Sequence, residues 1–239
     1  YDPEPLAYER FARLLGRETA TKLEVLGPMA IEELPEANAP VATLTGVDKF
    51  TVTPEQQAIL KRYVEAGGTL VIDAAGGSED FDKSARELIA AMFGADRLGT
   101  IATSHDLYRD PLPGVKDVKI EEVQYRRVTR KMLGKRKDPR LQAVFLKERP
   151  ALIYSKQDLT AGLVGYPSLT CDGYDPGDAR TPGSAYQLMR NIVLYAARSL
   201  PAEPTSAPAA TVPTAPAPAQ PAPAEPAPVE PAPAEPAPH

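Results

Sequence analysis

Nucleophilic and acid–base chemistry near neutral pH usually depends on a cysteine or a histidine, and this chain has one Cys and two His. One histidine is the last residue, so an imidazole base would have to be His105, in the segment Ser104-His105-Asp106. Side chains adjacent in a loop usually point apart, which makes Asp106 a poor partner for that base. We therefore expect a hydrogen-bonded structural histidine, with a catalytic base as the alternative.

The cysteine, Cys171, lies in a segment rich in acidic residues. A nucleophilic thiol needs its pKa lowered by a nearby positive charge, and acidic neighbours oppose this, so we do not expect Cys171 to be a nucleophile. Asp172, Asp175 and Asp178 recur every third residue and could offer oxygens to Ca²⁺. Their spacing does not match an EF-hand, and aspartates commonly hold turns, so no metal site is predicted.

A glycine-rich loop follows the apolar run TLVID, which ends at Asp73. Ligands of open parallel sheets bind outside the carboxyl ends of the strands, where small residues let them approach backbone N–H groups. The motifs GxGxxG and GxxxxGK[ST] are absent, so a loop that only turns the chain remains the main alternative. The predicted binding residues are Asp73, Gly76, Gly77, Ser78, His105, Ser155 and Asp158.

We expect no catalytic residue in this group. In the alternative hypothesis His105 is the base of a hydrolase-like enzyme, assisted by Asp73 or Asp158. That alternative requires Asp73 and His105 to lie at the same edge of the sheet, within reach of one bridging water.

A basic run offers a different kind of site. It contains Arg126, Arg127, Arg130, Lys131, Lys135, Arg136 and Lys137, which are seven cations in 12 positions. Gly134 and Asp138-Pro139 predict a hairpin tip or a protruding loop. Such a segment could bind a polyanion, namely an anionic lipid head, a polysaccharide or a nucleic-acid backbone, or it could be a solvated loop that pairs with acidic neighbours. With Tyr125 as its only aromatic neighbour, base stacking has little support and a nucleic-acid partner is not expected.

These residues must be positioned by alternating strands and helices. Apolar runs predict strands at 41–45, 69–73, 98–102 and 151–155. Alternating patterns predict exposed or edge strands at 118–123 and 142–146. Helical periodicity predicts helices within 5–20, 54–66, 81–93 and 184–199. Thr53, Pro54 and Gln56 have the types and spacing of a capping box. The rhythm of strand and helix predicts an α/β fold with a mainly parallel sheet covered on both faces.

Composition limits the remaining possibilities. The 239 residues carry 27 Lys+Arg and 32 Asp+Glu. Residues 201–239 contain 14 Pro, 13 Ala and four Glu, which leaves 27 − 28 = −1 for the first 200 residues and excludes polyanion binding by bulk charge. The tail is predicted to be a disordered spacer that folding does not require. One cysteine excludes an intramolecular disulfide, and no apolar run approaches the ~20 residues of a membrane span.

Several segments together resemble a bacterial domain of unknown function numbered 4159. They are PEPLAYERFARLLGRETATK, APVATLTG, LKRYVEAGGTLVIDAAGGSEDFDKS, SHDLY, IYSKQDL, CDGY and MRNIVLYAAR. The resemblance covers about residues 1–199 and is most specific over 63–84. It implies a class I glutamine amidotransferase-like, flavodoxin-like layered domain at 1–199, followed by the linker at 200–239. Family members usually have a strand before the position of Tyr1, so we expect this chain to be a piece of a longer product that lacks the first strand.

The chain departs from true amidotransferases, which carry a nucleophilic cysteine at the turn after a central strand. Here Asp73-Ala74-Ala75-Gly76 has no thiol, so amidotransferase activity is not expected. The resemblance implies a larger envelope-associated or secreted bacterial protein, with a cytoplasmic location as the alternative. We expect a non-catalytic binding or assembly domain that needs no cofactor, whose partners are a protein or envelope component and its own flanking domains.

Overall fold

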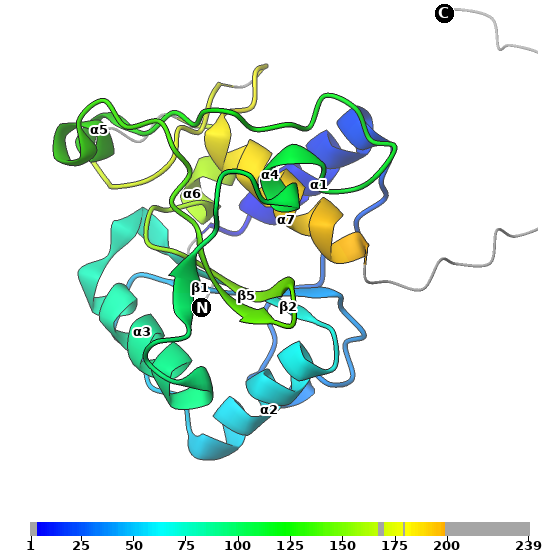
Figure 1. Cartoon of the computed structure of the whole chain (residues 1–239), viewed down its shortest axis with the longest axis vertical. Coiled ribbons are helices and arrows are strands. Elements are labelled where there is room, and N and C mark those ends of the chain that lie inside the picture. Colours follow the sequence, from blue (N-terminus) through cyan, green and yellow to red (C-terminus); the bar gives the residue numbers. More distant parts are fainter. Residues whose placement is uncertain (1–3, 167–169, 179, 199–239) are drawn as a thin grey trace, which may run out of the picture. The chain divides into compact units, whose positions relative to one another are not determined.

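The computed structural model describes residues 4–166, 170–178 and 180–198 (Figure 1). The predicted disordered tail therefore lies outside the described residues. Within them the chain forms one compact α/β unit, and the fold is a five-stranded sheet with helices on both faces.

The sheet has the strand order β1-β2-β5-β4-β3, formed by β1 (Val41–Gly46), β2 (Thr69–Ala74), β5 (Arg149–Ser155), β4 (Gln142–Leu146) and β3 (Leu98–Thr100). β1, β2 and β5 pair in parallel, whereas β4 is antiparallel to both of its neighbours. Four strands thus run in one direction and β4 runs in the other. The cause is the two-residue connection between β4 and β5, which is long enough only for a hairpin. The sheet is thus mainly parallel in strand direction, as predicted, and β4 is the antiparallel exception.

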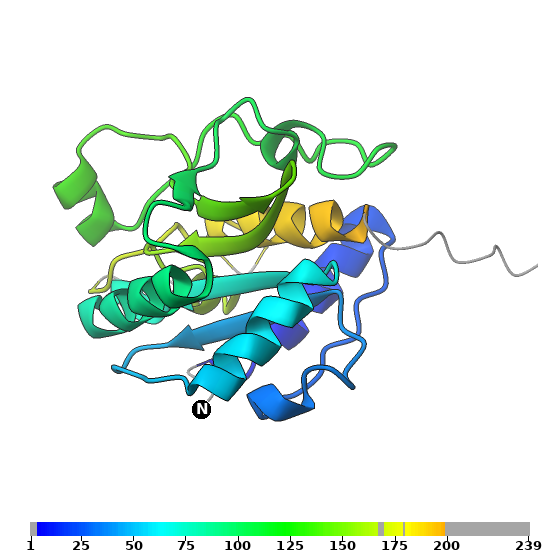
Figure 2. The ribbon, with the colours of Figure 1, turned by 60° about the horizontal axis from the view of Figure 1, so that its bottom comes forward.

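Helices cover the sheet on both faces. α2 (Pro54–Glu65) and α3 (Glu79–Phe93) pack on one face, and Figure 2 shows both in front of the strands. α1 (Ala7–Thr19), α4 (Asp106–Arg109), α6 (Thr160–Leu163) and α7 (Ser184–Ala197) pack on the other. Successive residues of β2 alternate between the two cores, since Leu70 and Ile72 face α2 and α3 while Val71 faces α1 and α7. Short helices η1 (Ile31–Glu33), η2 (Ala75–Gly77) and α5 (Arg127–Leu133) complete the unit.

Residues 118–123 do not form the predicted strand. Val118, Ile120 and Val123 are buried, as their apolar types suggested, but none of the strands within the described residues pairs with them. Helix α7 takes the place of a neighbouring strand, because Arg190 and Asn191 both donate to the Val118 carbonyl, at 2.9 and 2.8 Å. The predicted strand 142–146 is confirmed as β4, but it is not an edge strand, since β3 lies outside it.

Candidate functional site

The carboxyl ends of β2 and β5 bring together most of the predicted site. Asp73 is the last but one residue of β2, is paired in register with Ser155 and is 1 % exposed. Its carboxylate accepts hydrogen bonds from the backbone N–H of Leu159, at 3.0 and 3.1 Å, and of Thr160, at 2.8 Å. Asp73 therefore fixes the start of α6 to the end of β2.

A buried ion pair lies beside it. Arg126 Nη1 donates to Asp158 Oδ2 at 2.7 Å, and the two side chains are 1 % and 0 % exposed. The same nitrogen lies 2.9 Å from Cys171 Sγ, and Arg126 Nε donates to the Tyr174 carbonyl at 3.0 Å. Asp158 Oδ1 accepts from the N–H of Ala161 at 2.9 Å. Arg126 thus joins α6 to the segment 171–174 in the interior.

The electrostatics follow from two buried carboxylates near one guanidinium. Burial, and then the negative charge of Asp158, raise the pKa of Asp73 to about 7. Burial also raises the pKa of Asp158, although the charge of Arg126 opposes this shift. Arg126 bonds to Asp158, so Asp73 relies on backbone donors and on its own proton to remain in the interior.

The glycine turn after β2 is covered by the protein itself. The Gly76 carbonyl accepts from the N–H of Asp172 at 3.2 Å. Gly77 has φ +72°, and a Cβ there would lie 2.4 Å from the Cβ of Asp172. Thr129 of α5 holds the other side of this segment by donating to Asp172 Oδ1 at 2.5 Å. The close approach that the glycines permit is therefore made by residues 171–174, where a ligand was expected.

The two predicted serines have local structural roles. Ser78 caps α3 by accepting from the Phe81 N–H at 3.3 Å, and it donates to the Val47 carbonyl at 2.5 Å. Ser155 is fully buried and donates to the carbonyl of Gln157 at 2.6 Å. Both hydroxyls are thus engaged with the backbone.

His105 is not part of this site, and its predicted proximity to Asp73 is wrong. Its ring packs on Phe145 and Tyr195, with centroids 5.8 and 5.4 Å apart, and hydrogen-bonds to the backbone of Glu148 in the hairpin between β4 and β5. Phe145 pairs with Pro150 and Asp73 with Ser155, five positions further along β5, or about 16 Å at 3.3 Å per residue.

The physical reason is a reversal of the chain after β3. β3 does end at the carboxyl edge, but the following segment doubles back so that Ile101, Leu107 and Tyr108 enter the core. His105 Nδ1 then accepts from the Leu107 N–H at 3.1 Å and caps α4. Burial lowers the pKa of His105. The structural role that we expected for this histidine fits these contacts.

The acidic neighbours of Cys171 do not describe its surroundings completely. The sequence-based argument against a thiolate considered the flanking acids, whereas in the structure the Arg126 guanidinium contacts the sulfur. Asp175 and Asp178 hold turns, since they accept from the N–H groups of Gly177 and of Arg180 and Thr181. In the described parts of the chain, no three His, Cys, Asp or Glu side chains gather as a metal site would require.

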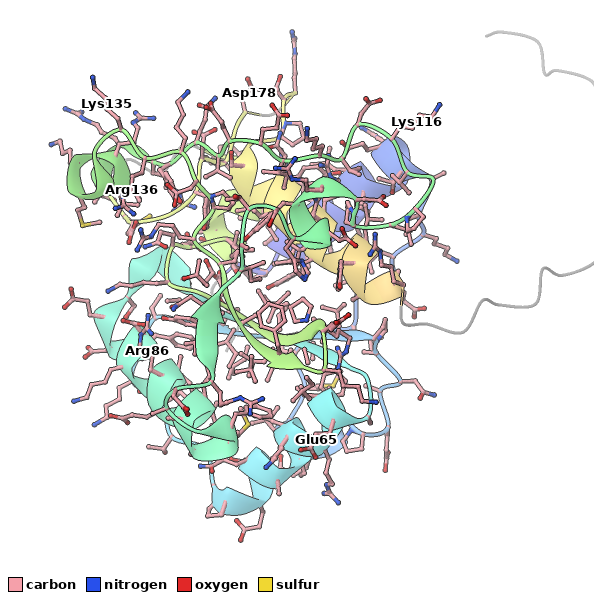
Figure 3. All side chains as sticks on the ribbon, in the orientation of Figure 1. Glu65, Arg86, Lys116, Lys135, Arg136 and Asp178 are labelled. Carbon is pink, nitrogen blue, oxygen red and sulfur yellow. The ribbon has the colours of Figure 1, made fainter. Side chains whose placement is uncertain are left out.

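The basic run forms helix α5 and the turn after it, and the predicted hairpin tip is wrong. Arg126 is buried in the ion pair and does not belong to the exposed set. The remaining cations of the run are Arg127, Arg130, Lys131, Lys135, Arg136 and Lys137, all exposed. α5 lies at the rim of the unit in both ribbon views (Figures 1 and 2), and Figure 3 shows Lys135 and Arg136 beside it. We call residues 127–137 the basic rim.

Sequence reasoning missed the roles of Arg126 and Thr129. Arg126 is an arginine in a run of arginines and lysines, and nothing local distinguishes it from the exposed ones. One signal was present in the sequence: Tyr125 and Val128 flank it with apolar side chains, which is unusual for a fully solvated loop.

No helix in the described ranges is both long enough and apolar enough to cross a membrane. No curated protein matches the chain. A family model does match, over residues 1–197, and it is described as a domain of unknown function, DUF4159. Because the match covers the whole folded unit, the chain belongs to the DUF4159 family.

Proposed function

We propose that this domain is a binding or assembly module of a larger bacterial envelope protein, and that it binds its partner through the basic rim. The proposal rests on the carboxyl edge of the sheet, where the residues expected to bind a ligand are buried or covered by the protein itself. Asp73, Asp158 and Arg126 are buried. Asp73 accepts hydrogen bonds from the backbone that follows Asp158, Arg126 pairs with Asp158, and residues 171–174 cover the glycine turn. This arrangement supports a structural role for the buried cluster. We therefore assign partner binding to an exposed surface of the domain.

The hydrolase alternative loses its support from geometry. It needed His105 as a base beside Asp73 or Asp158, and His105 caps α4 near the opposite edge. A distant relation to amidotransferases remains part of our proposal, because the parallel strands β1, β2 and β5 with helices on both faces are compatible with such a layered domain.

The basic rim is distinct from the rest of the chain in charge. Residues 127–137 hold six cations and no acidic residue, while the whole chain has a net charge of −5, so the other residues sum to −5 − 6 = −11. Lys137 pairs with Glu122 at 2.7 Å, but both side chains are well exposed and such pairs hold weakly. An anionic partner is therefore attracted locally to a protein that repels it elsewhere.

Binding of the full chain to immobilised inorganic polyphosphate tests this proposal. We expect retention at low salt, in spite of a pI of about 5.2, and elution as salt rises. The variant Lys131→Gln/Lys135→Gln/Arg136→Gln should elute at much lower salt.

The matched control is Lys22→Gln/Lys83→Gln/Lys116→Gln, which removes three exposed cations elsewhere and leaves the same net charge. Figure 3 shows Lys116 at a different corner of the unit from Lys135. Equal elution of wild type and of the rim variant would refute a binding role for the basic rim.

A further inference from the structure

We propose that the basic rim docks the domain on the surface of an anionic bilayer, with Met132 entering the layer between headgroups and acyl chains. This inference rests on the proposed function, because it names the partner of the same surface.

Met132 is 61 % exposed, although it lies in a helix that packs on the domain. The helix turns Thr129, which is buried, and Leu133, which is partly buried, toward the interior. Arg127 and Lys131 occupy the opposite face, and Met132 lies on the flank between that face and the interior, about 100° around the helix from Lys131. Single exposed apolar side chains are common on protein surfaces, and Leu6 and Tyr166 are more exposed than Met132. What sets Met132 apart is its place within a segment of six cations, a combination that suits a partner with a charged surface over an apolar layer.

The chemistry around Met132 fits a lipid surface. Lys and Arg can extend their charged ends to headgroup phosphates while their aliphatic stems lie along apolar material. Each cation near an anionic leaflet adds to the attraction, and the effect falls off within a Debye length of about 8 Å. A flat surface touched at the rim meets these six cations, of which Lys137 is paired with the exposed Glu122.

A dissolved polyanion fits the same surface less well. Residues 127–137 contain no aromatic side chain on which a base could stack. A soluble polysaccharide or polyphosphate would use the six cations but would leave Met132 in water. Met132 is therefore the residue that distinguishes a bilayer from a soluble polymer.

Co-sedimentation of the full chain with vesicles tests the docking. Vesicles of phosphatidylcholine and phosphatidylglycerol in equal parts should bind the protein, and vesicles of phosphatidylcholine alone should not. At about fivefold per cation, the variant Lys131→Gln/Lys135→Gln/Arg136→Gln should bind about 100-fold more weakly. The control Lys22→Gln/Lys83→Gln/Lys116→Gln should bind nearly as wild type does.

Met132→Ser should weaken binding to the anionic vesicles about tenfold, because the apolar burial is lost, and should leave binding to polyphosphate unchanged. Met132→Leu should restore vesicle binding. Far-ultraviolet circular dichroism of each variant confirms that the fold persists.

Three outcomes would overturn the docking. Binding to polyphosphate without binding to anionic vesicles refutes the bilayer and leaves the proposed function standing. Equal vesicle binding by wild type and Met132→Ser refutes insertion of this side chain. Absence of binding to both probes refutes the docking and the proposed function together.

Discussion

Removing the carboxylate of Asp158 should destabilise the domain strongly. Asp158→Ala leaves the Arg126 guanidinium buried without its counter-ion, and such an uncompensated charge costs about 3–5 kcal/mol. Arg126 Nη2 already has no hydrogen-bond partner in the described parts of the chain, and the other acceptors of the guanidinium, the Tyr174 carbonyl and Cys171 Sγ, are not carboxylates. At about 2–4 °C per kcal/mol for a domain of this size, the melting temperature should fall by about 6–20 °C.

The opposite truncation should be sensitive to pH. Arg126→Met leaves Asp158 and Asp73 buried near each other without a cation. Both carboxylates can escape this cost by taking up protons, so the loss of stability should be smaller at about pH 6 than at about pH 8. The double variant Arg126→Met/Asp158→Leu has neither charge and should be more stable than either single variant.

Thermal unfolding followed by circular dichroism at the two pH values measures these differences. Glu122→Ala/Lys137→Met is the control, because it removes an ion pair whose side chains are 64 % and 62 % exposed, and it should change the melting temperature by no more than about a degree. A loss of under about 3 °C in Asp158→Ala, or an equal loss at both pH values in Arg126→Met, would show that the buried pair does not hold the edge as described.

Three further predictions concern the same edge. The pKa of Asp73 is about 7 in the folded state, above its unfolded value, so the folded state binds this proton more tightly. The stabilisation from this proton is complete below pH ~4 and is lost as the pH rises toward 7. The difference in unfolding free energy between wild type and Asp73→Asn, measured in urea, should decrease over the same pH range. Gly77→Ala should destabilise the domain by at least ~2 kcal/mol more than Gly114→Ala, since both have positive φ but only Gly77 faces Asp172, and equal urea midpoints would contradict the close packing. Cys171→Ser keeps an acceptor for the guanidinium and should melt within about 2 °C of wild type and retain polyphosphate binding; loss of all binding by a folded variant would give the thiol a direct role.

The elements that the sequence predicts well are those whose signals are local. Thr53 and Gln56 predict the start of α2 by type and spacing, and both reciprocal bonds are present, at 3.3 and 3.0 Å. The strand 69–73 is confirmed because a β-prone run between a glycine pair and a glycine turn has few alternatives. Such features need only the neighbouring residues to form.

The features that the sequence did not predict depend on long-range contacts. The apolar types of Val118, Ile120 and Val123 correctly indicate which side chains of 118–123 are buried, but α7, some 70 residues later, supplies the hydrogen bonds that a strand would have made. Arg126 pairs with Asp158 across 32 positions. The location of His105 required the path of the chain after β3, which its own segment does not specify.

The attachment of α5 has a mechanical consequence. Arg126 immediately precedes the helix, and its side chain reaches into the interior to Asp158 and to the carbonyl of Tyr174. A force that pulls on the basic rim therefore acts on the buried ion pair at the end of the central strands, so the rim does not detach from the domain as an isolated surface loop would. Thr129, bonded to Asp172 from the next turn, shares that load. The buried polar cluster at the carboxyl edge of the sheet therefore anchors α5, and a force applied to the basic rim is transmitted through this cluster to the rest of the domain.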